Sequence, residues 1–299
     1  MRIGVVEGRT AFLRDGRYAD AATVSGGKVL ADPTSMYTQW KELNSAYQNA
    51  ADEEFHDLGE KVLSIPVPSP RQVFAVGANY RLHIEEAGAE PPKRPLIFTK
   101  FPSCLTGPTA SIEAPSDSID WEVELVAVIG QHADHVPAGH GWDYVAGLTV
   151  GQDITDRVLQ FDGSHPQFSL SKSRRTFGPL GPALVTPDEF EDPDDLEIGC
   201  ALNGETQQAS RTSDLIFPVP LLVEYLSSVC TLYPGDLIFT GTPSGVGAFK
   251  KPATFLRPGD ILTSWVEGIG SLTNTVTEAP PSTGTAIPAP VGSWSGVND

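Results

Sequence analysis

Short apolar runs separated by Gly, Pro and Asp dominate the chain from Val73 to Thr277. Frequent short runs with turn residues between them are typical of a β-rich domain. Two stretches differ, because their apolar residues recur at helical spacing: one includes Arg81–Ala87, and one runs from about Val219 to Val229. The runs predicted as strands are Val73–Val76, Leu96–Phe98, Glu122–Ile129, Tyr144–Val150, Leu237–Thr240 and Ile261–Val266.

A small N-terminal domain is predicted over residues 1–70. Met1–Glu7 and Thr10–Leu13 have the composition of two strands joined by a tight turn. A helix is predicted from about Ser35 to Ala51, where Met36, Trp40, Leu43 and Tyr47 share one face.

Prolines at positions 66, 68 and 70 mark a linker, so a larger domain is expected over residues 71–278. The segment 279–299 is rich in Pro, Gly, Ser and Thr, and an extended C-terminal tail is expected there.

Composition restricts the classes of function. The formal net charge of −18 opposes binding to nucleic acid or to an anionic membrane, because phosphate groups require a basic face. No apolar run reaches the ~18 residues of a transmembrane helix, and the charged start has no signal-peptide core. A cytoplasmic location is therefore expected. Neither a disulfide framework nor a thiolate zinc site is indicated by the isolated residues Cys104, Cys200 and Cys230.

Three carboxylates form the sharpest chemical candidate. Alternation along a strand places Glu122 and Glu124 on one face, and Asp120 joins them if the strand begins that early. Close carboxylates repel one another unless a cation or protons intervene, although a solvated strand face has the same pattern. Asp153 follows a second apolar strand. The three together make an oxygen-rich site suited to Mg²⁺, Mn²⁺ or Ca²⁺.

Two further groups are candidates for chemistry. On a helix, His83 and Glu86 are i,i+3 neighbours, so they form either a general-base pair or an incidental surface pair. Ser171–Arg175 concentrates positive charge in an acidic protein, or is a solvated basic loop. The glycine-rich turn Gly241–Gly247 lacks the Lys-Ser/Thr ending of a phosphate-binding loop. A surface location is assigned to His132, His135 and His140.

From about Arg71 to Val276 the chain resembles the fumarylacetoacetate hydrolase superfamily, whose motifs it carries in order. The resemblance implies an α+β, β-rich fold: a β-roll catalytic domain with a small N-terminal α/β lobe, usually as a homodimer. The motifs are Val76-Gly77-Ala78-Asn79-Tyr80 with His83, Pro95 to Lys100, Asp120-Trp121-Glu122-Val123-Glu124, Val145-Ala146-Gly147 with Asp153, Arg157 and Gln160, Lys172 with Gly178 to Pro182, Leu202-Asn203-Gly204-Glu205, and Pro234 to Pro243.

The resemblance also implies residue roles. A divalent metal, Mg²⁺ or Mn²⁺ with Ca²⁺ as the third candidate, is expected on Glu122, Glu124 and Asp153. His83 and Glu86 match a water-activating pair, and Lys172 matches a group that stabilises an oxyanion. Substrate contacts are implied for Arg157, Gln160 and Thr242.

The implied substrate is a small anionic 2-oxo acid that chelates the metal. The leading expectation is hydrolysis of a carbon–carbon bond in an acylpyruvate. The alternatives are an oxaloacetate-type decarboxylase, a 2-hydroxydienoate isomerase, or a non-catalytic protein that binds a 2-oxo acid.

Two departures from the superfamily pattern bear on substrate identity. Arg174 and Arg175 replace a common Phe-Asp pair, and they either recognise a second substrate carboxylate or pair with the acidic surface. Gln152 stands where Asn is frequent, which can alter the surroundings of Asp153.

Overall fold

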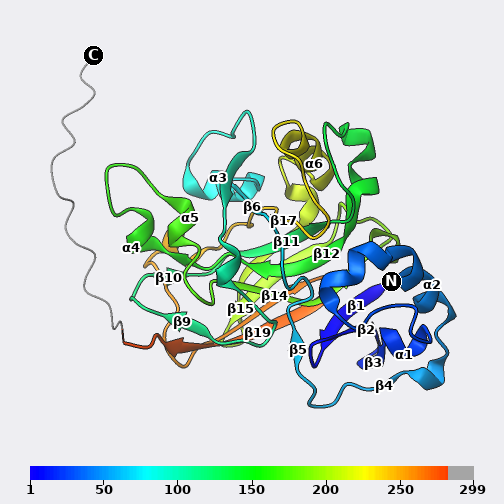
Figure 1. Cartoon of the computed structure of the whole chain (residues 1–299). Helices are drawn as coiled ribbons and strands as arrows, with labels where there is room; N and C mark the ends of the chain where they lie inside the picture. Colours follow the sequence, from blue (N-terminus) through cyan, green and yellow to red (C-terminus); the bar gives the residue numbers. More distant parts are fainter. Residues whose placement is uncertain (282–299) are drawn as a thin grey trace.

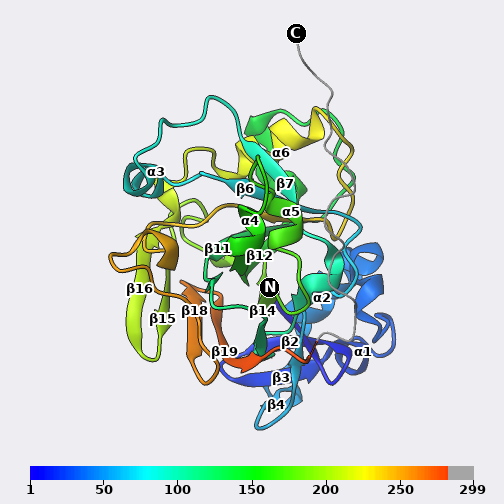
Figure 2. The same cartoon turned by 90° about the vertical axis from the view of Figure 1, so that its left-hand side faces the viewer.

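The chain folds into a strand-rich α+β structure in which short helices and loops surround two sheets (Figures 1 and 2). The structure is a computed structural model that describes residues 1–281. The predicted tail over 279–299 therefore falls outside the described residues from position 282 onward. Within residues 1–281, no helix has the length and apolar character needed to cross a membrane.

The larger sheet contains twelve strands of the described chain, in the order β4-β3-β2-β1-β14-β12-β11-β17-β6-β7, with β5 beside β1 and β8 beside β14. Its strands are β1 (Arg2–Val6), β2 (Arg9–Arg14), β3 (Arg17–Asp20), β4 (His56–Asp57), β5 (Leu63–Ser64), β6 (Val73–Gly77), β7 (Leu96–Thr99), β8 (Leu105–Thr106), β11 (Val123–Ile129), β12 (Val145–Gln152), β14 (Gly178–Val185) and β17 (Leu237–Phe239).

A second sheet of five strands has the order β16-β15-β18-β19-β9, and β10 pairs with β13 beside it. These strands are β9 (Ile112–Ala114), β10 (Ile119–Asp120), β13 (Thr155–Asp156), β15 (Glu197–Leu202), β16 (Glu205–Arg211), β18 (Ile261–Val266) and β19 (Gly270–Glu278).

The helices are short and lie at the periphery of the sheets (Figure 1). The α-helices are α1 (Ala21–Val24), α2 (Trp40–Asn49), α3 (Arg81–Ala87), α4 (Arg157–Gln160), α5 (Phe168–Ser171) and α6 (Val219–Ser227). The 3₁₀ turns are η1 (Pro33–Gln39), η2 (Asp52–Glu54), η3 (Pro102–Cys104), η4 (Ala138–Tyr144), η5 (Pro187–Glu189), η6 (Thr212–Asp214) and η7 (Gly247–Phe249).

The predicted strands correspond to β6, β7, β11, β12, β17 and β18, and two of the predicted helices correspond to α3 and α6. The helix predicted from Ser35 to Ala51 is instead divided into η1 and α2. Pro33 opens η1 after Asp32, whose side chain accepts a hydrogen bond from the Thr34 amide. This local cap starts a tight 3₁₀ turn, and α-helical geometry begins only at Trp40.

The N-terminal hairpin is confirmed by the pairing of β1 with β2. Its turn residues Glu7 and Gly8 both have positive φ, at 51° and 78°, as a tight hairpin requires. The other edge of β1 pairs with β14, so the N-terminal segment extends the large sheet. The domain division at residues 70 and 71 stays a prediction, as does the homodimer.

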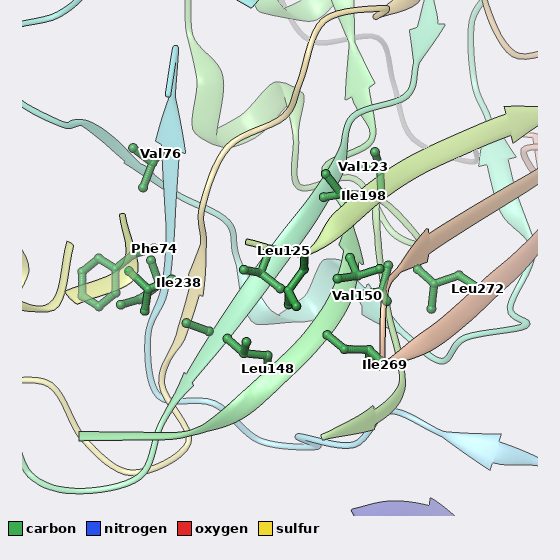
Figure 3. Packing of buried hydrophobic residues seen from close by; sticks show 14 of the residues in the cluster. Phe74, Val76, Val123, Leu125, Leu148, Val150, Ile198, Ile238, Ile269 and Leu272 are labelled. Atoms are coloured by element: carbon green, nitrogen blue, oxygen red, sulfur yellow. The ribbon is translucent and has the colours of Figure 1, made fainter. Parts of the chain in front are cut away.

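Strand β11 separates two apolar cores, because its side chains alternate between the faces of the sheet. Val123 and Leu125 pack in one core against the second sheet, where Figure 3 shows them near Val150 and Ile198. Val126 and Val128 pack in the other core, with the N-terminal segment. Because both faces of β11 are buried, the strand cannot rotate about its axis. This fixes the direction in which the Glu122 and Glu124 side chains at its N-terminal end point.

Candidate active site

The register of two neighbouring strands brings the predicted carboxylates together. Strands β11 and β12 are antiparallel with Val123 opposite Gln152, so the start of one strand lies beside the end of the other. The Asp153 amide donates to the Glu122 carbonyl oxygen at 2.8 Å. Gln152 strengthens this junction, because its Oε1 accepts from the Glu122 amide at 2.9 Å and its Nε2 donates to Ser264.

The predicted triad of Glu122, Glu124 and Asp153 is a buried cluster. One carboxylate oxygen from each residue lies within 4.8 Å of the others. Asp120 does not join them, because β11 begins only at Val123 and Asp120 belongs to the separate strand β10. The donor set is entirely oxygen, which suits a hard divalent cation.

Glu122 is held by two cations. Its Oε1 lies 2.8 Å from Arg157 Nη2, and its Oε2 lies 2.7 Å from Lys172 Nζ. Burial alone would raise the pKa of Glu122, but the charges of Lys172 and Arg157 outweigh burial and lower the pKa to about 2. Glu122 is therefore a carboxylate at neutral pH even without a metal.

Glu124 has no such partner. Its Oε2 accepts from the Gly241 amide at 2.8 Å, and no ion pair to Glu124 forms within residues 1–281. Burial, together with the negative charges of Asp153 and Glu122, raises the pKa of Glu124 well above its usual range. A bound cation would supply the missing positive charge at this position.

Asp153 leaves one oxygen for a ligand. Its Oδ1 accepts from Lys100 Nζ at 2.7 Å. Its Oδ2 is buried, and although Lys172 Nζ lies 2.7 Å away, the directions are not those of a hydrogen bond. Lys172 balances the charge of this oxygen, but no hydrogen bond occupies its lone pairs, so Oδ2 is available as a ligand and the residues present fit a divalent cation.

The charges of the site favour the same conclusion. Four carboxylates, namely those of the triad and Asp120, face three cations, which are Lys100, Arg157 and Lys172. With all four carboxylates ionised, the cluster carries one excess negative charge before a metal is counted. A divalent cation would make it positive, as the binding of an anionic substrate requires.

The predicted pair of His83 and Glu86 forms on α3, with Nδ1 of the histidine 3.3 Å from Oε2 of the glutamate. The helix ends at Gly88, which adopts the left-handed conformation typical of a C-terminal cap. The Gly245 amide donates to both carboxylate oxygens of Glu86 at 3.1 Å, and this anchors the pair to the glycine-rich loop.

One cavity of about 220 Å³ joins the pair to the triad. This volume is below the ~300–1,000 Å³ of pockets for drug-sized ligands, so a small substrate fits. Asp153 and Glu86 do not line the cavity and instead contact residues that do. The predicted site residues among the lining are His83, Glu122, Glu124, Arg157, Gln160, Lys172 and Thr242.

Arg157 and Gln160, two of the residues predicted to contact the substrate, lie on the short helix α4. The Asp156 side chain caps α4 by accepting from the Leu159 amide at 3.1 Å. The resulting turn brings Arg157 Nη1 to 3.0 Å from Gln160 Oε1 at the cavity wall. The Thr242 hydroxyl is already paired, since it donates to the Val123 carbonyl oxygen at 2.9 Å and accepts from Gln208 at 2.8 Å.

The arginines that depart from the superfamily pattern lie outside the cavity lining. Arg174 Nε donates to Asp156 Oδ2 at 2.9 Å, and Arg175 pairs with Glu113. Of the two interpretations that the sequence left open, this geometry favours pairing with acidic groups of the protein.

Two buried residues position other residues of the site in ways that the sequence did not indicate. Lys100 joins Asp153 to the carbonyl oxygens of Lys172 and Phe177. Asp120 accepts from the amides of Gly247 and Ala248 at 2.7 and 3.0 Å, and from Arg157 Nε at 2.8 Å. Asp120 therefore fixes Arg157 relative to the loop that anchors Glu86. Its carboxylate was visible in the Asp-Trp-Glu-Val-Glu motif, but its partners are distant in sequence.

Asp120→Asn is expected to lower turnover by ~10²-fold, because misplacement of a positioning group by ~1 Å has such an effect. Metal affinity, measured by titration with Mn²⁺, should change little because Asp120 is outside the triad. Asp117→Asn is the matched control, since Asp117 pairs with Arg257 at 3.0 Å on the surface. Equal losses of activity in both variants would show that Asp120 has no positioning role.

Comparisons with known proteins identify the family of this chain. The family model described as fumarylacetoacetate (FAA) hydrolase C-terminal matches residues 72–277. Human oxaloacetate tautomerase FAHD2A, mitochondrial, is 43% identical over 275 residues, which cover 87% of this chain and 88% of the human protein.

Two solved structures are also similar. A putative HpcE protein from Mycobacterium smegmatis has 46% identity and a TM-score of 0.87, covering 94% of this chain and 100% of that one. Maleylpyruvate hydrolase from Sphingobium sp. SYK-6, in complex with manganese (II) ion and pyruvate, has 26% identity and a TM-score of 0.78. The match covers 94% of this chain and 100% of that one. The chain belongs to the fumarylacetoacetate hydrolase family.

Proposed function

We propose that this chain is a divalent-metal-dependent isomerase that interconverts the enol and keto forms of small 2-oxo acids, with oxaloacetate as the first substrate to test. One observation carries the proposal: a single small cavity is lined both by carboxylates able to hold a metal and by a histidine able to move a proton. The human relative named oxaloacetate tautomerase supports this reaction class. The manganese and pyruvate complex of the Sphingobium relative supports the metal and the 2-oxo acid.

The metal would be held by Glu122, Glu124 and Asp153. When bound, a divalent cation polarises the 2-oxo group of a substrate and favours its enolised form. Mg²⁺ and Mn²⁺ are the first candidates, because both accept all-oxygen sites and leave positions for a chelating substrate.

His83 would carry the proton. Conversion of the enol to the keto form breaks the O–H bond at C2 and forms a C–H bond at C3, with no net gain or loss of atoms. Nδ1 of His83 is paired with Glu86, which leaves Nε2 to accept and return the proton. Lys172 and Arg157 place positive charge at the same wall, where negative charge develops on the substrate oxygens.

Carbon–carbon hydrolysis of an acylpyruvate, the first expectation from the sequence, becomes the second candidate. The same histidine could deprotonate a water molecule, and a relative with 26% identity is named maleylpyruvate hydrolase. The relative with 43% identity is named oxaloacetate tautomerase, which favours enol–keto isomerisation over hydrolysis. Decarboxylation of oxaloacetate uses the same stabilised enolate and is distinguished by its products.

The test is a product assay on metal-supplemented protein with enol oxaloacetate, keto oxaloacetate and acetylpyruvate. We expect rapid enol–keto conversion, visible as loss of enol absorbance and as deuterium exchange at C3, with little pyruvate or acetate formed. Acetate release faster than C3 exchange would replace the proposal by hydrolysis. Stoichiometric pyruvate from oxaloacetate would replace it by decarboxylation.

A further inference from the structure

The cavity has two chemically different halves. The half at the carboxylate triad contains all of its formal charges, including Arg157 and Lys172. The other half is apolar, and its larger side chains are Ile84, Leu96, Phe98, Phe161, Phe168 and Phe249.

Aromatic rings begin directly beside the polar groups. The Lys172 ammonium nitrogen lies 5.4 Å from the centroid of the Phe98 ring, which packs against Phe168 with 5.5 Å between centroids. The His83 ring also has an aromatic neighbour, since its centroid lies 5.6 Å from that of the Phe249 ring. A substrate whose 2-oxo acid end is at the triad therefore extends its remaining atoms along aromatic walls.

The apolar half offers no cation to a distal anion. Arg157 and Lys172 are the only lysine or arginine residues of the described chain that line the cavity, and both are already paired with Glu122. A carboxylate that lies against these apolar walls loses part of its hydration and gains no partner, which is unfavourable. The second carboxylate of oxaloacetate is compatible with the site, because it is bonded to C3 and stays in the charged half.

The apolar wall reaches the surface at the mouth of the cavity. Leu96 is 47% exposed, Phe161 is 61% exposed and Phe249 is 43% exposed. Partly exposed large apolar side chains around a concave site are typical of surfaces that bind apolar ligands.

From these observations we infer that, among 2-oxo acids longer than oxaloacetate, the outer half of the cavity selects those whose chain beyond C3 is apolar, aliphatic or aromatic, over acids of equal length that end in a second carboxylate. The inference rests on the proposed function, since it assumes that the 2-oxo acid end binds at the triad. It adds the substrate class that the reaction chemistry alone leaves open.

A matched pair of ligands tests the inference. 2-Oxohexanoate and 2-oxohexanedioate have the same carbon chain and differ only in a methyl group or a carboxylate at the far end. Calorimetric titration of the Mn²⁺-loaded protein should give a Kd for 2-oxohexanoate at least ~10-fold lower. Equal or tighter binding of the diacid would overturn the inference.

Two variants place a cation in the outer half. Leu96→Arg and Phe161→Arg change partly exposed side chains, and each should lower or reverse the ratio of the two dissociation constants by ~10-fold. Val229→Arg is the control, because Val229 is 76% exposed and does not line the cavity. It adds the same charge to an acidic protein and should leave the ratio unchanged. An unchanged ratio in both cavity variants would contradict the inference.

The inference and the proposed function can fail separately. Deuterium exchange at C3 of oxaloacetate reports on the isomerase, whereas the ratio of dissociation constants reports on the outer half. Exchange without binding of 2-oxohexanoate would overturn the inference alone, and absence of exchange in every metal-loaded sample would overturn the isomerase.

Discussion

Removal of divalent cations by exhaustive chelation is expected to lower kcat/KM for oxaloacetate enolisation by ~10³-fold or more. Polarisation by a metal supplies several kcal/mol of stabilisation, and each ~1.36 kcal/mol corresponds to a factor of ten in rate. Mg²⁺ or Mn²⁺ should restore activity in proportion to occupancy, measured by C3 deuterium exchange alongside metal analysis. Full activity in metal-free protein would exclude a catalytic metal.

Glu124→Gln should abolish stabilisation by the metal without destabilising the metal-free protein. Burial and the nearby charges of Asp153 and Glu122 raise the pKa of Glu124, so its negative charge is destabilised in the metal-free protein. The amide is close to the carboxyl group in shape, and the Tm without metal should be unchanged or higher. The variant should lose the stabilisation by metal, which for one site is ~2.7 kcal/mol at one hundred times Kd. A metal-induced rise in Tm equal to that of the unmodified protein would remove Glu124 from the ligand set.

His83→Ala is expected to lower the rate of enol–keto conversion by ~10²–10⁴-fold, the usual contribution of a general acid–base group. His83 lies outside the group of three carboxylates, so metal affinity should be preserved. The measurement is C3 deuterium exchange at saturating Mg²⁺, with Mn²⁺ titration of the same sample. Activity close to that of the unmodified protein would mean that another group, such as Lys172, carries the proton.

His140→Ala provides a closely matched control for His83. His140 Nδ1 lies 3.0 Å from Asp143 Oδ2, and this pair has the same i,i+3 spacing and the same histidine–acid composition. The pair is exposed and lies outside the cavity lining. Its loss should leave enolisation unchanged, which separates a catalytic role of His83 from a general effect of removing a paired histidine.

Much of the fold follows from local sequence. The runs at Val73, Glu122 and Tyr144 became β6, β11 and β12 with boundary shifts of one or two residues. Such runs are recognisable because turn residues bound them and burial requires apolar side chains. Where a local cap competed with periodicity, as at Asp32 and Pro33, the predicted helix was wrong over its first part.

The sequence by itself indicated which residues to consider for the candidate site, and the family resemblance indicated their expected roles. Strand alternation placed Glu122 and Glu124 on one side, helical spacing paired His83 with Glu86, and the ordered motifs identified the family. These relations are local or are written in residue order, so no long-range contact is needed to read them.

Only the tertiary structure decided how those residues are connected. It showed that the triad and the histidine pair line one cavity or contact its lining, that Lys100 fixes Asp153, and that Asp120 belongs with Arg157 and the glycine-rich loop. It also showed a cavity that is charged at one end and apolar at the other. The physical reason is that periodicity fixes which side of an element a residue faces, whereas sheet register and loop packing fix which distant residue it meets.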